Sequence, residues 1–138
     1  MNELLLNNPI GNIIEKIFNL ATVLTTVGKT WLRDKINETV QTTGDYIGWG
    51  TGSGTAAAGD TALFTEAAES RVTATRSVPT SDTVQWVGTL TSASAQTITN
   101  AGNFTASTSG TLIVHGDFTG IVLAINDQIQ FTIKIQFT

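Results

Sequence analysis

The sequence predicts a mainly β protein, a jelly-roll-like antiparallel β-sandwich preceded by one or two N-terminal helices. The chain is rich in threonine and has 13 glycines, residues that suit pleated strands and turns respectively. Short apolar runs recur at intervals of roughly 8–12 residues, as in sandwiches and barrels. The clearest run covers 128–138 and places five apolar residues on one face, alternating with polar ones: Ile129, Phe131, Ile133, Ile135 and Phe137.

The length favours a single domain with a core of its own. A chain of 138 residues buries roughly two-thirds of its unfolded surface when it folds. Within it we expect an N-terminal helical arm over residues 1–43 and a β-sandwich domain over residues 44–138. No tandem repeat of the kind found in fibres or solenoids is visible.

The N-terminal segment predicts a flexible lead over residues 1–8 and then an amphipathic helix. Pro9 can open a helix, and Gly28 can end it. The apolar stripe of this helix either plugs the core of its own domain or lies on another subunit. The candidate interface residues in this segment are Leu4, Leu5, Leu6, Ile10, Ile13, Ile14, Ile17 and Phe18. A second helix, capped by Thr30, is expected over residues 31–40.

A glycine-rich stretch follows, and the chain changes from helix to strand around it. Residues 46–49 predict a short apolar strand. The glycines at 48, 50, 52 and 54 then free the backbone for a loop. A polar turn is expected at 59–61, before a compact apolar segment at 62–64.

The remaining strands are expected in the second half of the chain. Residues 69–78 predict a strand that Pro79 ends. Residues 83–90 alternate, with Val84, Trp86 and Leu90 on one face. Further strands are expected at 97–99, 111–118, 121–125 and 128–138, and a turn at 100–104.

The composition disfavours several classes of function. The formal net charge of −4 argues against a nucleic-acid partner, because neutralising phosphates requires clustered Lys and Arg. There are no cysteines, so neither disulfides nor thiolate metal sites can form. The apolar run 10–27 is interrupted by polar residues and is a poor membrane span, and the first residues lack the basic region of a secretion signal. We expect no cofactor, no metal and no membrane partner.

The second half of the chain carries few charges. From residue 79 onward the charged residues are Asp82, Asp117, Asp127 and Lys134. Free-standing sheets usually protect their edges with charge, especially Lys. This sparse protection indicates faces or edges covered by a partner, with a homo-oligomer, for instance a trimer, as one such partner. The alternative is a surface made soluble by threonine hydroxyls alone.

No motif predicts catalysis. Residues 54–61 imitate a phosphate-binding loop, but Asp60 stands where that motif requires Lys and would repel phosphate. His115 and Asp117 share a strand face, and a cross-strand surface pair is favoured over a metal site because no further ligand completes one. Glu66 and Glu69 could face each other for acid–base work, or pair with nearby arginines. No catalytic residue is therefore assigned.

The order of motifs resembles a widespread group of small virion proteins of tailed bacteriophages, known as tail-fibre, tail or capsid-decoration proteins. The matching segments lie at 28–36, 46–52, 56–63, 97–104 and 109–113, followed by the closing alternating strand. The resemblance covers about residues 28–138, and residues 1–27 lie outside it. Two positions depart from the group, where Asn100 commonly corresponds to an acidic residue and Asn126 often to Gly.

The resemblance implies a structural protein of the virion and no enzyme. A capsid cement or decoration protein would bind the major capsid protein or other virion subunits at the capsid surface and stabilise the shell. A tail or tail-fibre-base component, with a possible role in binding the host surface, is the alternative. Trp49 and Trp86 could stack on sugars in such a role, but we expect them in the core.

Overall fold

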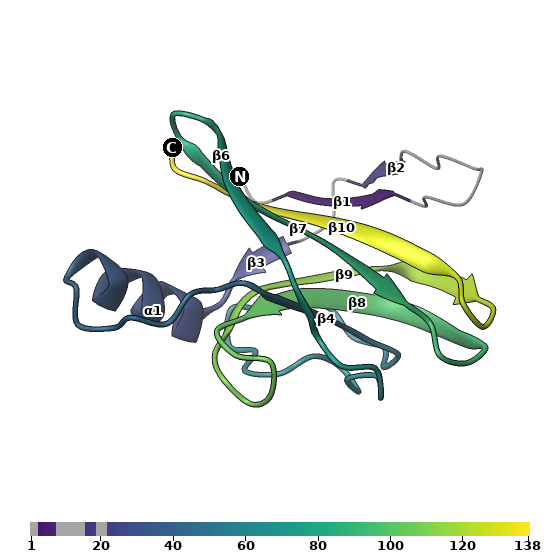
Figure 1. The fold of residues 1–138 in the computed structure, drawn as a ribbon. Helices are drawn as coiled ribbons and strands as arrows, with labels where there is room; N and C mark the ends of the chain where they lie inside the picture. The colour runs from purple at the N-terminus through teal and green to yellow at the C-terminus, as the bar shows by residue number, and fades with distance from the viewer. Residues whose placement is uncertain (1–2, 8–15, 19–21) are drawn as a thin grey trace.

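The computed structural model describes residues 3–7, 16–18 and 22–138 and shows a mainly β chain with antiparallel sheets and the helix α1 (Thr26–Ile36). The strands within these described residues form two five-stranded sheets (Figure 1). Sheet A has the order β2 (Lys16–Phe18), β1 (Glu3–Asn7), β10 (Gln128–Gln136), β7 (Thr83–Thr91) and β6 (Thr75–Thr80). Sheet B has the order β3 (Thr22–Leu24), β9 (Leu112–Leu123), β8 (Gln96–Phe104), β4 (Tyr46–Gly50) and β5 (Val72–Thr73).

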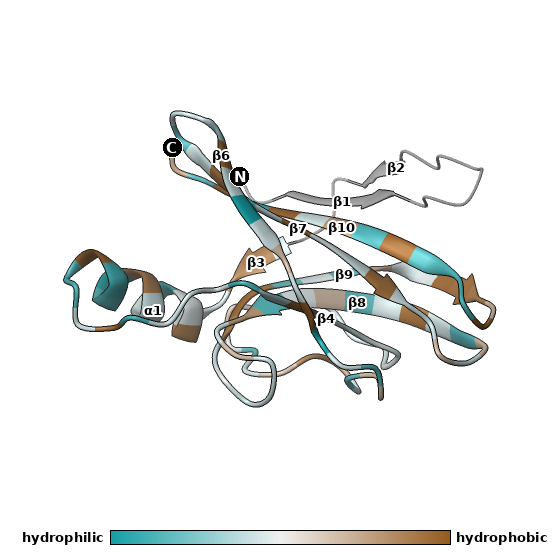
Figure 2. Cartoon of the chain, viewed as in Figure 1, coloured by the Kyte–Doolittle hydropathy of each residue, from teal (hydrophilic) through white to brown (hydrophobic). Residues whose placement is uncertain are grey.

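The expected alternation at the end of the chain is confirmed in β10 and β7. These strands pair antiparallel, with Ile129 opposite Leu90 and Ile133 opposite Trp86, and all four side chains are buried. Figure 2 shows β10 banded between hydrophobic and hydrophilic residues, as a strand with one buried face should be. The observed strand is shorter than the alternating pattern, however. Phe137 lies beyond the end of β10, with 51% of its surface exposed.

The two sheets share one hydrophobic core. Trp49 of sheet B meets Phe131 of sheet A edge-on at 6.1 Å between ring centroids, and Phe118 lies 6.3 Å from the same ring. Trp49 and Trp86 are buried, which confirms their expected place in the core. The indole N–H of Trp86 donates to Asp45 at 3.0 Å, so the polar edge of this buried ring has a partner.

Sheet B differs from the sequence prediction in its longest strands. The turn expected at 100–104 is wrong, because β8 runs without interruption through Asn100 and Asn103. The two strands expected at 111–118 and 121–125 are one strand, β9. Asn and Gly residues favour turns by their local chemistry, but here the asparagine side chains are buried and hydrogen-bonded inside the fold, and this tertiary context decides the outcome.

The N-terminal helix is contradicted at the positions that the structure describes. Leu4, Leu5 and Leu6 lie in β1, which pairs with β10, so they are not a flexible lead. Ile17 and Phe18 lie in β2, while Ile10, Ile13 and Ile14 fall outside the described residues. Short apolar runs fit a helix or a strand equally well by periodicity, and β-branched Ile favours the strand. The first strands thus belong to the same sheets as the rest of the chain.

The helix α1 begins earlier than expected. Thr25 is its N-cap, and the Thr25 hydroxyl accepts a hydrogen bond from the Gly28 amide at 2.9 Å. Gly28 lies inside the helix and does not end it. A Cβ at Gly28 would lie 2.4 Å from the Ile113 carbonyl oxygen, so glycine lets the helix contact the β9 backbone directly. Among the described residues no helix is long and apolar enough to cross a membrane.

Pro79 lies within β6, which continues to Thr80, whereas the prediction ended the strand before this proline. The strand is fully exposed and forms an edge of sheet A. Its register with β7 shifts between Ser77 and Thr80. An edge strand tolerates proline because one side needs no ladder hydrogen bonds, and the irregularity protects the edge from pairing with another chain.

Candidate functional site

The loop between β4 and β5, residues 51–71, lies on the face of sheet B that is directed away from sheet A (Figure 1). Glycines on the sheet make room for it. A Cβ at Gly50 would lie 2.5 Å from the Phe64 carbonyl oxygen, and one at Gly102 would lie 3.3 Å from Leu63. Gly48, Gly50, Gly52 and Gly54 have no positive φ. These residues therefore provide space for close contact, whereas the sequence suggested backbone freedom.

His115 holds the middle of this loop from inside the fold. Its side chain is fully buried. The Nδ1 atom lies 2.6 Å from the Asp60 carboxylate, and Nε2 lies 3.2 Å from the Asn100 side-chain oxygen. The ring also packs on Phe64, 4.6 Å between centroids. The expected surface pair of His115 with Asp117 is wrong, because alternation along the strand could not reveal that the loop covers this face.

The Asn100 amide adds side-chain hydrogen bonds to the loop backbone. Its Nδ2 donates to the carbonyl oxygens of Gly52 and Phe64, and its Oδ1 accepts from the Phe64 amide at 3.1 Å. Asn103 acts in the same way on the connection before β4, donating to Gly44 at 3.1 Å. Buried backbone groups need such partners, so Asn100 belongs to the scaffold of the loop and Asn103 to that of the connection before β4.

The aspartates of this region also bind loop backbone. Asp60 accepts from the Ala57 amide at 2.8 Å and thereby closes the turn at 57–60. Asp117 accepts from the Ala56 amide at 2.7 Å. The resemblance of residues 54–61 to a phosphate loop therefore has a structural origin, since the amides that might cradle an anion are occupied by carboxylates of the same chain.

Glu66 and Glu69 do not form a carboxylate pair. Glu66 accepts two hydrogen bonds from Arg71, at 2.6 and 2.9 Å, and the Arg71 guanidinium lies 3.4 Å from the centre of the Phe104 ring. A structural role of Glu66 in pairing with a nearby arginine, the favoured interpretation, is thus confirmed. Arg76 pairs with Asp45 at 2.9 Å.

Glu69 binds the connection between β7 and β8. It accepts from the Trp49 indole, the Ala93 amide and the Gln96 side chain at 3.2, 2.9 and 2.6 Å. Burial raises the pKa of Glu69, but the hydrogen bonds from Ala93, Trp49, Gln96 and its own amide outweigh burial and lower the pKa overall. The carboxylate is therefore an ionised structural acceptor.

The polar side chains of His115, Asp60, Asn100 and Asp117 hold the loop 51–71 in place. Within the described ranges, no three His, Cys, Asp or Glu side chains gather as a metal site. His115, Asp60, Asn100 and Asp117 each bind loop backbone or one another, as described above. Asn100 and Asn103 were the residues that sequence reasoning missed as a scaffold. Their position between Thr99 and Phe104, in a segment that could have been read as one alternating strand, was the available signal.

The outer face of sheet A is built differently. Strand alternation places on it the residues of β7 and β10 that do not face the core, and we name this set the Thr/Gln face: Thr83, Gln85, Val87, Thr89, Thr91, Gln128, Gln130, Thr132, Lys134 and Gln136. Cross-strand hydrogen bonds join it, for example from Gln128 to Thr91 at 3.0 Å. Lys134 is its one charged residue.

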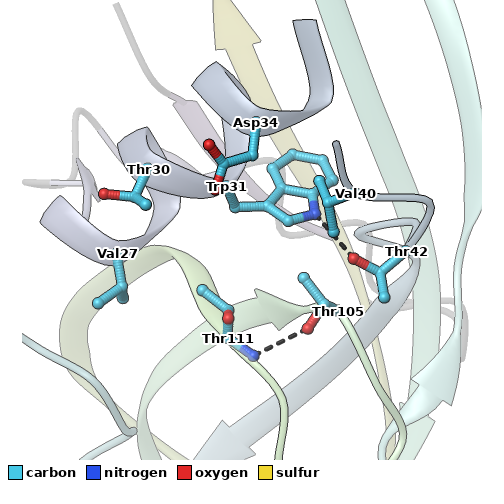
Figure 3. Close-up of a pocket in the computed structure, with 8 residues that line it drawn as sticks. All are labelled: Val27, Thr30, Trp31, Asp34, Val40, Thr42, Thr105 and Thr111. Carbon is cyan, nitrogen blue, oxygen red and sulfur yellow. Dashed lines mark hydrogen bonds between the residues drawn. The ribbon is translucent and has the colours of Figure 1, made fainter. Parts of the chain in front are cut away.

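A hollow of about 390 Å³ lies between α1 and the hairpin loop that joins β8 to β9 (Figure 3). The helix contributes one face to it, at intervals of three and four residues. The other walls come from the segment after the helix and from the hairpin loop. The hollow is lined by Val27, Thr30, Trp31, Asp34, Val40, Thr42, Thr105 and Thr111.

Comparisons of this chain with models of protein families, with curated proteins and with solved structures find no match.

Proposed function

We propose that this chain is a structural subunit of a tailed-phage virion, a cement or decoration protein that binds the capsid shell and stabilises it. The observation that carries the proposal is the difference in chemistry between the two outer faces. The loop 51–71 covers sheet B, whereas the Thr/Gln face of sheet A carries one charge, Lys134, among ten residues. Such a face can dock on a protein partner without desolvating many charges.

Exposed apolar side chains also occur at the edge and at the end of sheet A. Val78 of β6 is 70% exposed, and Phe137, directly after β10, is 51% exposed. Phenylalanine is enriched where proteins meet, while charged residues are depleted at interface cores. A partner that reaches from the Thr/Gln face to this edge and end of sheet A would bury apolar side chains together with uncharged polar groups.

The finer fold assignment, a jelly-roll-like β-sandwich, belongs to the same proposal. The first strand of sheet A, β1, pairs with the last strand of the chain, β10, and β3 pairs with β9. Jelly rolls wrap the two ends of the chain together in this manner. The candidate interface residues Leu4, Leu5, Leu6, Ile17 and Phe18 lie in β1 and β2, and their contact with a neighbouring subunit stays a prediction, as does that of Ile10, Ile13 and Ile14.

The copy number in purified virions tests the proposal. Quantitative mass spectrometry should find this chain in many copies, comparable with the major capsid protein, if it is a cement protein. A few copies per particle would favour the alternative, a component of the tail or of the tail-fibre base. Absence of the chain from the virion would contradict both.

A further inference from the structure

The hollow beneath α1 results from how the helix is attached to the rest of the chain. The helix is fixed at its start, where Gly28 lies directly on the Ile113 backbone and Thr25 donates to the Leu112 carbonyl at 2.6 Å. The chain returns after the helix and is tied to it by the Trp31 indole, which donates to Thr42 at 3.1 Å. Figure 3 shows Thr105 and Thr111 closing the opposite side. The walls of the hollow are therefore already positioned before any ligand arrives.

Two threonine hydroxyls in this hollow have a proton to donate. The Thr42 oxygen accepts from the Trp31 indole, and the Thr105 oxygen accepts from the Thr111 amide at 2.8 Å. Each hydroxyl oxygen thus uses a lone pair on a fixed N–H, and its own proton stays available for an acceptor on a ligand. The two donors come from different walls of the same hollow.

Asp34 supplies an acceptor whose charge is compensated. Its Oδ1 receives both hydrogen bonds from Arg33, at 2.8 and 2.5 Å. The Oδ2 atom takes part in neither of these bonds and can accept from a ligand hydroxyl. Because Arg33 offsets the negative charge, a neutral donor fits better than an ammonium group, and the carboxylate disfavours an anion.

The remaining walls are apolar. Val27, Val40 and the Trp31 indole line the hollow beside the hydroxyls. A purely apolar ligand would leave the threonine hydroxyls and the carboxylate without partners, at a cost in free energy. A sugar ring combines apolar C–H faces with a rim of hydroxyls that both donate and accept. The volume of about 390 Å³ is near the lower end of the range for ligand sites, roughly 300–1,000 Å³.

We propose that this hollow binds a neutral carbohydrate, one or two pyranose rings in size. The inference does not depend on the proposed attachment to a capsid shell. It also assigns Trp31, which is 9% exposed, to the ligand, whereas the sequence analysis considered Trp49 and Trp86 for contact with a sugar. Those two side chains are 1% and 2% exposed and lie in the core.

Saturation-transfer NMR on the full chain tests the proposal, with methyl glucoside, methyl galactoside and N-acetylglucosamine as probes. We expect at least one of these sugars to receive saturation and to shift the resonance of the Trp31 indole N–H. The variant Thr30→Trp fills the mouth of the hollow from an exposed helix position and should weaken binding at least about tenfold. Thr26→Trp is the matched control, since Thr26 is exposed on the same helix but does not line the hollow.

A melting curve for each variant separates loss of the site from loss of the fold. If Thr30→Trp does not fold, Thr42→Val decides, because it removes one donor and keeps the side-chain size, and it should also weaken binding. The proposal is overturned if no sugar receives saturation, if Thr26→Trp weakens binding as much as Thr30→Trp, or if only methylammonium or acetate shifts the Trp31 resonance.

Discussion

The two sheets of this protein turn chemically opposite outer faces away from their shared core. On sheet B the outer face carries the glycines at 48, 50 and 102 together with buried polar side chains, and the loop 51–71 lies directly on it. On sheet A the outer residues of β7 and β10 are mostly threonine and glutamine, and they are half-buried or exposed. The outer face of sheet B is thus covered by the chain itself, whereas the outer face of sheet A is available to a partner.

This difference separates polar groups that stabilise the fold from polar groups that lie at the surface and can contact a partner. Asn100 in sheet B has its amide fixed by three loop backbone groups. Gln130 in sheet A makes one long hydrogen bond, 3.5 Å, to Thr89. Removing the Asn100 amide should destabilise the fold, because buried polar groups without partners are costly. Changing the Gln130 amide should affect only the binding of a partner at the surface.

The largest expected effect comes from adding a methyl group under the loop. Gly50→Ala would place its Cβ 2.5 Å from the Phe64 carbonyl oxygen, and we expect a loss of about 2–3 kcal/mol in unfolding free energy from overpacking. Gly88→Ala in sheet A is the matched control, since its nearest neighbours are side-chain atoms at 3.2 Å or more, and it should cost less than about 1 kcal/mol. Denaturant unfolding measures both. Equal losses would mean that the loop does not rest on the sheet.

A smaller effect is expected when the Asn100 amide becomes a carboxylate. Asn100→Asp removes the donor to the Gly52 and Phe64 carbonyl oxygens and should reduce the unfolding free energy by about 1–3 kcal/mol. Gln130→Glu, the same change on the Thr/Gln face, should alter it by less than about 0.5 kcal/mol. An unchanged melting temperature for Asn100→Asp would show that the loop does not need this donor.

The same contrast between the two sheets shows how far the sequence could predict the structure. The alternation of β10 and β7 was readable because their inner side chains meet only other apolar side chains. Asn100, Asn103 and His115 were misread because their partners are loop atoms distant in sequence, up to 59 positions for Asn103 and Gly44. Local turn propensity is a weak signal against such tertiary contacts.

The backbone conformation at Asn126 fits its residue type. Asn126 adopts a positive φ of 70° in the turn before β10. Glycine and asparagine are the residues that accept this conformation most readily. The hollow beneath α1 gave no comparable signal, because its walls come from three separate segments.

The smallest expected effect is a pH dependence at the end of sheet A. Hydrogen bonds from Thr80, Gln136 and Thr83 lower the pKa of Asp82 from 3.8 to about 2. A carboxylate whose pKa is lower in the folded than in the unfolded chain stabilises the fold at pH values above its unfolded pKa. This contribution is lost as the pH falls from about 4 to about 2. Asp82→Asn should therefore reduce the fall in melting temperature over that window. An identical fall in wild type and variant would remove Asp82 as a contributor.

The contrast between the outer faces is tested most directly by sedimentation velocity at micromolar concentration. We expect the wild-type chain to associate, with a trimer as the proposed state, and Thr89→Glu on the Thr/Gln face to shift it to the monomer without changing its melting temperature. Thr61→Glu, on the exposed loop over sheet B, should associate as the wild type does. A monomeric wild type, or association that Thr61→Glu abolishes while Thr89→Glu does not, would contradict the assignment of sheet A as the partner-binding face.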